Sequence, residues 1–204
     1  LDTFPASNRP LLVVDGTQAI GVMPFNVQQI KAAYVACSVH KWLNCPYGMS
    51  LVYVAPQFHS LWQPLDKHER GHVGSNQEGW DEIIFMDSET GYYPQELFPD
   101  ARRFDAGGKA NPVTIPMVRA GLQSVLRWES GFIAAHTRTL TVALAQKLTA
   151  VMKDHLLIRR SDQCSPHIMG IRFAPASPLL RAVPLVLLNG RLKENNVFCS
   201  GFLS

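Results

Sequence analysis

Three short apolar runs, at residues 11–14, 34–37 and 49–54, stand out in the first part of the chain. Runs of this length without polar alternation are typical of strands buried on both faces of a parallel sheet. The turn dipeptide Asp15-Gly16 closes the first run, and residues 27–33 predict a short crossover helix before the second. Strands that alternate with a helix predict an α/β fold.

The pattern becomes helical after residue 113. Residues 56–113 are rich in Gly, Pro and charged side chains and predict a long, loop-rich connection. Met117, Val125 and Trp128 share one helical face, with Thr114 as the expected N-cap. We then expect a helix over about 132–154, strands at 156–158, 168–173 and 197–199, and a helix at 184–192. A domain boundary near residue 130 fits this change of pattern.

Composition narrows the class of protein. The 204 residues are 47% hydrophobic and 17% charged, which argues against disorder, and the net charge of +3 comes without any basic run that would indicate nucleic-acid binding. No apolar stretch reaches the ~18 residues that a membrane helix needs, and the first residues do not resemble a secretory signal. Four scattered cysteines fit a reducing compartment. We therefore expect a cytoplasmic protein with neither nucleic acid nor membrane as a partner.

Polar side chains follow the first two predicted strands. Asp15 and Gln18 come after the first strand, and Ser38, His40 and Lys41 end the second. In open α/β sheets, ligands bind in the crevice beyond the carboxyl ends of the strands. Each residue alone has an ordinary interpretation, since Asp-Gly is a common turn and most lysines are surface residues. Together they predict one site.

The chemistry of this set fits pyridoxal 5'-phosphate. The Lys41 amine can form a Schiff base with an aldehyde cofactor and later act as general base and acid. A carboxylate such as Asp15 would keep the cofactor's ring nitrogen protonated. Gln18 could donate to the phenolic oxygen of the cofactor, and Ser38 and His40 could bind its phosphate. We expect no metal ion at this site.

The segment of residues 11–54 resembles the cofactor-binding core of class V aminotransferases, the fold-type I group that includes cysteine desulfurases and isopenicillin-N epimerase-like proteins. The family's Asp-x-x-Gln falls on Asp15 and Gln18, and its Ser-x-His-Lys falls on Ser38, His40 and Lys41. A second segment, residues 102–112, resembles the family's glycine-centred loop. In family dimers, that loop approaches the cofactor phosphate of the other subunit.

The resemblance implies a PLP-dependent transferase-like fold. Residues 1–130 would be part of the large PLP-binding domain, with a mostly parallel sheet, and residues 131–204 would be an incomplete, small α+β C-terminal domain. The implied substrate is an amino acid or amine, and the implied assembly is a homodimer if the chain is complete. Transamination, elimination, desulfuration and epimerisation all remain open.

The sequence also departs from the family pattern. Nothing in it corresponds to the preceding half of the large domain, and the residues after 200 diverge before the arginine that binds the substrate carboxylate in family members. Gly107-Gly108-Lys109 stands where some relatives have Gly-Thr. The alternative hypothesis is therefore a truncated, catalytically incompetent relative that acts as a non-enzymatic module.

An HExxH pattern and the four cysteines are two other candidates for reactive sites. Residues 68–72 match the HExxH zinc-peptidase pattern, with Glu78 or Glu82 as a third ligand, but Gly71 and the lack of an apolar stripe favour a loop. None of the four cysteines stands out as the reactive thiol of a desulfurase, and Cys37, on a predicted strand, is expected to pack as a small hydrophobic residue.

Overall fold

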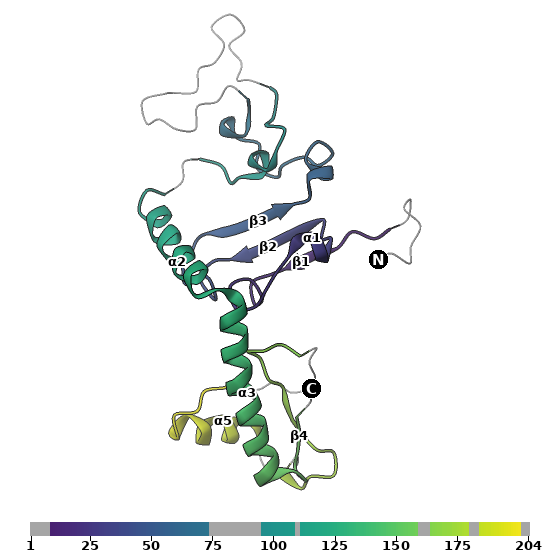
Figure 1. Cartoon of the computed structure of the whole chain (residues 1–204), viewed down its shortest axis with the longest axis vertical. Helices are drawn as coiled ribbons and strands as arrows, with labels where there is room; N and C mark the ends of the chain where they lie inside the picture. The colour runs from purple at the N-terminus through teal and green to yellow at the C-terminus, as the bar shows by residue number, and fades with distance from the viewer. Residues whose placement is uncertain (1–8, 74–94, 109–110, 159–163, 180–183, 201–204) are drawn as a thin grey trace, which may run out of the picture. The chain divides into compact units, whose positions relative to one another are not determined.

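A computed structural model describes residues 9–73, 95–108, 111–158, 164–179 and 184–200. The chain divides into two compact units, Leu1–Ser130 and Gly131–Ser204. Figure 1 shows the helices and strands of both units.

The first unit is built on a three-stranded sheet of order β1-β2-β3. The strands are β1 (Val13–Asp15), β2 (Tyr34–Ser38) and β3 (Ser50–Val54). The predicted strands are therefore confirmed, each within two residues of its expected bounds. The short helix α1 (Val27–Ile30) crosses between β1 and β2, and begins where the Asn26 side chain accepts hydrogen bonds from the first free backbone N–H groups.

The prediction of a mostly parallel sheet is wrong for these strands. β1 and β2 are parallel, with Asp15 opposite Ala36, but β2 and β3 are antiparallel, with Ser38 opposite Ser50. The connection over residues 39–49 is too short for the crossover that a parallel neighbour requires, so β3 must run back beside β2. β1 is also less buried than expected: the Val13 side chain is 64% exposed, because β1 pairs with only one described strand.

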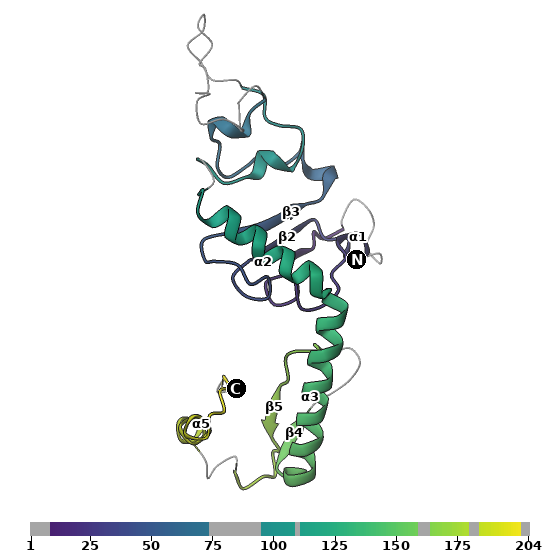
Figure 2. The ribbon, with the colours of Figure 1, turned by 60° about the vertical axis from the view of Figure 1, so that its left-hand side comes forward.

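Helix α2 (Thr114–Trp128) covers one face of the sheet (Figure 2). The predicted N-cap, Thr114, is instead the first helical residue, and the Asn111 side chain accepts from the backbone N–H groups of Val113 and Thr114 at 2.8 and 3.3 Å. A Cβ atom at Gly121 would lie 2.7 Å from the Cys45 sulfur and 2.8 Å from the Leu43 carbonyl oxygen. The helix and the loop after β2 thus approach closely.

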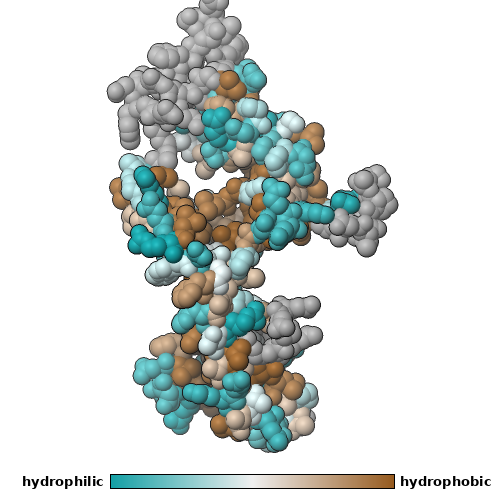
Figure 3. All heavy atoms as spheres, in the orientation of Figure 1, coloured by the Kyte–Doolittle hydropathy of each residue, from teal (hydrophilic) through white to brown (hydrophobic). Residues whose placement is uncertain are grey.

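The hydrophobic side chains of this unit gather beside α2 and over the strands (Figure 3). The connection between β3 and α2 contains three 3₁₀ turns among the described residues: η2 (Pro56–Phe58), η3 (Glu69–Gly71) and η4 (Ala101–Phe104). This agrees with the loop-rich connection that the sequence predicts.

The second unit contains α3 (Ser130–Met152), the antiparallel strands β4 (Leu156–Ile158) and β5 (Ile171–Phe173), and α5 (Leu185–Glu194). The predicted strand at 197–199 is wrong: Asn196 turns the chain with φ 58° after α5, and the following residues pair with no described strand. No helix in the described ranges combines the length and the apolar character that crossing a membrane requires.

Candidate cofactor site

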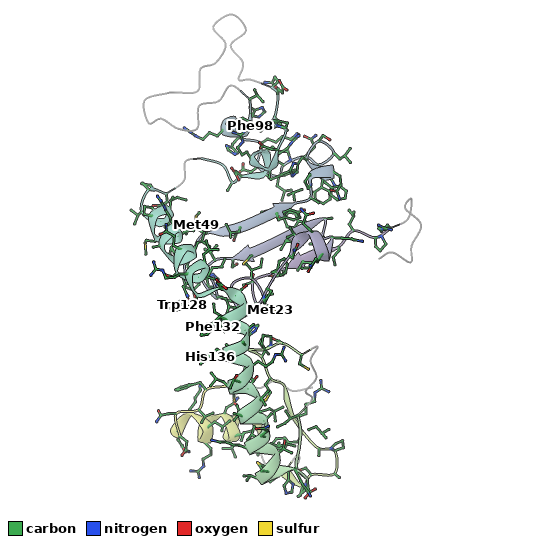
Figure 4. The ribbon with its side chains drawn as sticks, in the orientation of Figure 1. Met23, Met49, Phe98, Trp128, Phe132 and His136 are labelled. Atoms are coloured by element: carbon green, nitrogen blue, oxygen red, sulfur yellow. The ribbon has the colours of Figure 1, made fainter. Side chains whose placement is uncertain are left out.

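The predicted site residues lie at one edge of the sheet in the first unit. Asp15 is the last residue of β1 and Ser38 the last of β2, and the two strands are parallel. Parallel strands place their carboxyl ends at the same edge, so the loops of residues 15–18 and 38–42 are neighbours. This edge faces the α2 side, where Met49 leads the chain back into β3 (Figure 4).

Asp15 carries an ionised carboxylate at this edge. Its Oδ1 atom accepts a hydrogen bond from the Thr17 backbone N–H at 2.9 Å. Hydrogen bonds from the Thr17 side chain and backbone, together with the positive charge of Lys41, hold the pKa of Asp15 below its usual value against a smaller effect of burial. A carboxylate that stays ionised is the group that a protonated ring nitrogen requires.

Lys41 and Asp15 attract each other, although they form no direct ion pair in the described part of the chain. The Lys41 side chain is exposed. Its position is set by the turn that follows, in which the Asn44 N–H donates to the Lys41 carbonyl oxygen at 3.2 Å and Asn44 adopts φ 54°. The amine and the carboxylate therefore lie at the same end of the sheet without a direct ion pair.

Thr17 links the two loops through a hydrogen bond. Its side chain is buried, and its Oγ1 atom accepts a hydrogen bond from the Ser38 N–H at 3.1 Å. Sequence reasoning missed this residue. The sequence does place a hydroxyl two positions after the aspartate that ends β1. The contact of that hydroxyl with Ser38, however, depends on the register of the two strands.

Gln18 is held by Trp42. The indole N–H of Trp42 donates to the Gln18 side-chain oxygen at 3.1 Å, and the Gln18 side chain is exposed. Gly21, at φ 99°, lies close to the Trp42 backbone: a Cβ atom there would lie 2.6 Å from the Trp42 carbonyl oxygen. Trp42 thus contacts a predicted cofactor ligand directly.

His40 stacks on Tyr47, with ring centroids 4.1 Å apart and an interplanar angle of 19°. Tyr47 is itself mostly exposed, so the pair lies at the protein surface. The contact orients the imidazole that the sequence assigns to a phosphate.

The glycine-centred segment is held by contacts of its own. The Gly107 N–H donates to the Asp66 carboxylate at 2.6 Å, and the Arg102 guanidinium binds Asp100 and lies 4.1 Å above the Phe98 ring (Figure 4). Burial raises the pKa of Asp105 in this segment. Residues 109–110 lie outside the described residues, so the predicted approach to a partner subunit's phosphate stays a prediction.

The HExxH motif does not form the α-helix that a zinc site of this type needs. Residues 69–71 make a single 3₁₀ turn, in which the His68 Nδ1 atom accepts from the Arg70 N–H at 3.2 Å. Among the described residues, no group of three or more His, Cys, Asp or Glu side chains could hold a metal ion. Glu78 and Glu82 lie outside those residues.

Two of the four thiols are buried beneath the site. Burial raises the pKa of the Cys37 and Cys45 thiols, and the Cys45 sulfur donates to the Leu43 carbonyl oxygen at 3.0 Å. Cys37 packs on β2 as the sequence predicts. Neither is a reactive nucleophile in this environment.

Comparison with known proteins gives the family. A sequence model described as "Aminotransferase class-V" matches residues 6–186. The chain belongs to the class-V aminotransferase family. The cofactor of that family is pyridoxal 5'-phosphate.

Relatives within and around the class-V family are consistent with this assignment. The hercynylcysteine sulfoxide lyase of Schizosaccharomyces pombe is 30% identical over 98 residues, which is 48% of this chain and 24% of the lyase. The fold is similar to that of a cysteine desulfurase from Thermococcus onnurineus NA1, with a TM-score of 0.61 and 19% identity, over 92% of this chain and 41% of that one.

A further similar structure is the cystine C–S lyase C-DES in complex with its product cysteine persulfide, with a TM-score of 0.60 and 19% identity, over 94% of this chain and 45% of that one. These likenesses show the fold-type I arrangement. This chain spans under half the length of each of these relatives.

The residues present fit the family cofactor. Three kinds of group lie at one end of the sheet: an ionised carboxylate, an exposed amine and an oriented amide. These are the groups that the ring nitrogen, the aldehyde and the phenolic oxygen of the cofactor require, in that order. The hydroxyl of Ser38 and the imidazole of His40 lie on the same loop.

Proposed function

We propose that this chain is the cofactor-binding part of a pyridoxal-phosphate-dependent enzyme that acts on an amino acid. The observation that carries the proposal is that Asp15 and the loop with Lys41 follow two parallel, adjacent strands, and that the Lys41 charge contributes to the lowered pKa of Asp15. The bound cofactor would supply an electron sink for the substrate's α-carbon while attached to Lys41 as a Schiff base.

Each residue of the site has one role in this proposal. The Asp15 carboxylate binds the ring nitrogen and keeps that nitrogen protonated, because the lowered pKa of Asp15 leaves the carboxyl group ionised. Gln18 donates its amide N–H to the phenolic oxygen, and Ser38 and His40 bind phosphate oxygens. The Lys41 amine, released when substrate binds, removes and returns the proton at the substrate's α-carbon.

A sulfur-bearing amino acid is the substrate class that we favour. The printed names of the relatives, a sulfoxide lyase, a cysteine desulfurase and a cystine C–S lyase, all concern carbon–sulfur chemistry. With such a substrate, the proton lost to Lys41 would leave electrons that expel the sulfur group from the β-carbon. Transamination of another amino acid remains the alternative within the family.

The assembly and the compartment follow the family expectation. We propose a homodimer in the cytoplasm, with the glycine-centred loop of residues 102–112 directed to the partner's cofactor.

A non-enzymatic module is the second candidate. The exposed apolar side chains of Leu11 and Val13 on the β1 side favour it, because they leave an apolar strand edge uncovered.

Borohydride trapping tests the proposal. The purified full chain would be incubated with pyridoxal phosphate and reduced, and the modified peptides mapped. We expect saturable labelling at Lys41, its loss in Lys41→Ala, and no change in Lys153→Ala, which removes an exposed lysine of the second unit. Labelling scattered over many lysines in the unmodified chain would overturn the proposal and support the module.

A further inference from the structure

The two loops of the site are joined by two hydrogen bonds whose acceptors, Thr17 and Gln18, are adjacent in the sequence. The Ser38 N–H donates to Thr17, and the Trp42 indole donates to Gln18. We propose that Thr17 and Trp42 are positioning residues, which orient the Asp15 carboxylate and the Gln18 amide before the cofactor binds. What those two groups then bind rests on the proposed function.

The Thr17 hydroxyl lies between the two loops. A hydroxyl has one proton to donate and oxygen lone pairs that accept. The oxygen accepts from the Ser38 N–H at 3.1 Å, and the interaction of the hydroxyl with the Asp15 carboxylate lowers the pKa of that carboxyl group. Thr17 itself is buried, which limits the access of water to its hydroxyl. The Thr17 backbone N–H donates to the same carboxylate at 2.9 Å, so Thr17 contacts both Asp15 and the loop after β2.

Trp42 settles which way the Gln18 amide points. An indole nitrogen can only donate, so the amide atom 3.1 Å away must be the oxygen. The amide NH₂ group is then directed away from Trp42 and remains available as a donor. A donor is what a phenolate oxygen requires, whereas the opposite amide orientation would present an oxygen and repel it.

The protein holds the Trp42 end of this contact rigidly. The loop around it is anchored by the buried side chains of Val39 and Leu43. Gly21 lies against the Trp42 backbone with no room for a side chain. Orienting groups before the ligand arrives lowers the entropic cost of binding. The expected consequence is that removing either bond weakens the site without removing any group that touches the cofactor.

The first test needs no cofactor. Carboxyl ¹³C NMR of the full chain would follow the titration of Asp15 in the unmodified protein, in Thr17→Val, which keeps the shape but loses the hydroxyl, and in Thr17→Ser. We expect the pKa of Asp15 to rise in Thr17→Val and to return toward the original value in Thr17→Ser. An unchanged pKa in Thr17→Val would overturn the role of Thr17.

The second test concerns Trp42 and also begins without cofactor. The ¹⁵N-labelled indole N–H of Trp42 should shift and exchange faster with solvent in Gln18→Leu, but stay hydrogen-bonded in Gln18→Glu, which keeps an acceptor. An indole signal that ignores Gln18→Leu would overturn the contact. This result does not depend on whether the chain binds pyridoxal phosphate.

With cofactor, Trp42→Phe should weaken pyridoxal-phosphate binding by about threefold to tenfold, the range for one neutral hydrogen bond, and should shift the pH at which the absorbance of the bound cofactor changes. Trp62→Phe is the matched control, since Trp62 stacks on Phe58 away from the loops. If Lys41 is labelled normally and Trp42→Phe behaves like Trp62→Phe, the positioning role fails while the proposed function stands. If Lys41 is not labelled in the unmodified chain, the proposed function fails, and the two NMR tests still decide the contacts.

Discussion

The two units of the chain differ in how they use their apolar side chains. The first buries a continuous set around β2 and the loop that follows it, including Val22, Val35 and Val39. Among the described residues of the second unit, the buried apolar residues are Ala145 and Pro166, although α3 is 23 residues long. Leu140 and Leu144, on the apolar face of α3, are about half exposed or more.

This difference shows which part of the molecule supports the chemistry. All five candidate ligands lie on the first unit, and the loops that carry them rest on its core. The second unit holds its long helix by polar contacts instead: Thr141 donates to the Pro166 carbonyl oxygen at 3.0 Å, and Arg138 to that of Cys164 at 3.2 Å. We therefore expect the cofactor site to respond to changes in the first core and to tolerate changes in the second unit.

Thiol labelling should give the largest contrast between the units. Cys37 and Cys45 are buried in the first unit and the pKa of each is raised by burial, whereas Cys199 is exposed in the second. Under native conditions, Cys199 should react with a maleimide faster than Cys37 by on the order of a hundredfold, because Cys37 must await local opening.

Mass spectrometry of the time course, with the chain in denaturant as the reference in which all four thiols react alike, measures this ratio. Equal native rates for Cys37 and Cys199 would mean that the core under the site is loose, and the contrast between the units would be lost.

A matched pair of truncations should give the next largest effect. Val35→Ala removes two methyl groups from a fully enclosed position on β2 and should lower the free energy of unfolding by about 2 kcal/mol. Leu140→Ala, on α3, should change it by less than about 0.5 kcal/mol. Labelling at Lys41 should fall in Val35→Ala and remain in Leu140→Ala.

The four tryptophans, Trp42, Trp62, Trp80 and Trp128, all lie within residues 1–130, so their fluorescence in urea reports on the first unit. Circular dichroism reports on the helices of both. A loss of stability in Leu140→Ala as large as in Val35→Ala would show that α3 packs far more tightly than its exposure indicates.

Local patterns in the sequence predicted much of this fold. The apolar runs located β1, β2 and β3, and the spacing of apolar residues located α2 and α3, since these signals depend on the period of one element. The convergence of the loops after β1 and β2 followed from one further rule, that ligands gather at the carboxyl ends of strands. The roles of Asp15 and Lys41 remain predictions.

Features that depend on a partner far along the chain could not be predicted in this way. The exposure of Val13 depends on which strands pair with β1, whereas the direction of β3 follows from the short connection of residues 39–49, a local signal that the prediction of a mostly parallel sheet did not use. At the start of α2, the Asn111 side chain accepts from the N–H groups of Val113 and Thr114, a role that the sequence had assigned to Thr114 and that the residue type alone does not decide. Thr17 needed the register of two strands to reveal its contact with Ser38.

Replacing each of two helical glycines by alanine should change the free energy of unfolding in opposite directions. This is the smallest effect that we expect. Alanine gains roughly 1 kcal/mol over glycine inside a helix. At Gly190, in α5, the added Cβ meets no atom within 4 Å, so Gly190→Ala should stabilise the second unit by most of that amount.

At Gly121, in α2, the added Cβ would overlap the Cys45 sulfur and the backbone oxygens of Leu43 and Asn44, and backbone cannot move aside as a flexible side chain can. Overpacking of this kind costs about 2 kcal/mol, so Gly121→Ala should destabilise the first unit by about 1 kcal/mol net of the helix gain. Tryptophan fluorescence for Gly121→Ala and circular dichroism for Gly190→Ala, both in urea, would measure the two shifts. If Gly121→Ala stabilised the chain as Gly190→Ala does, α2 could not lie against the Leu43–Cys45 turn, and the loop that carries Lys41 would lose the support on which the site depends.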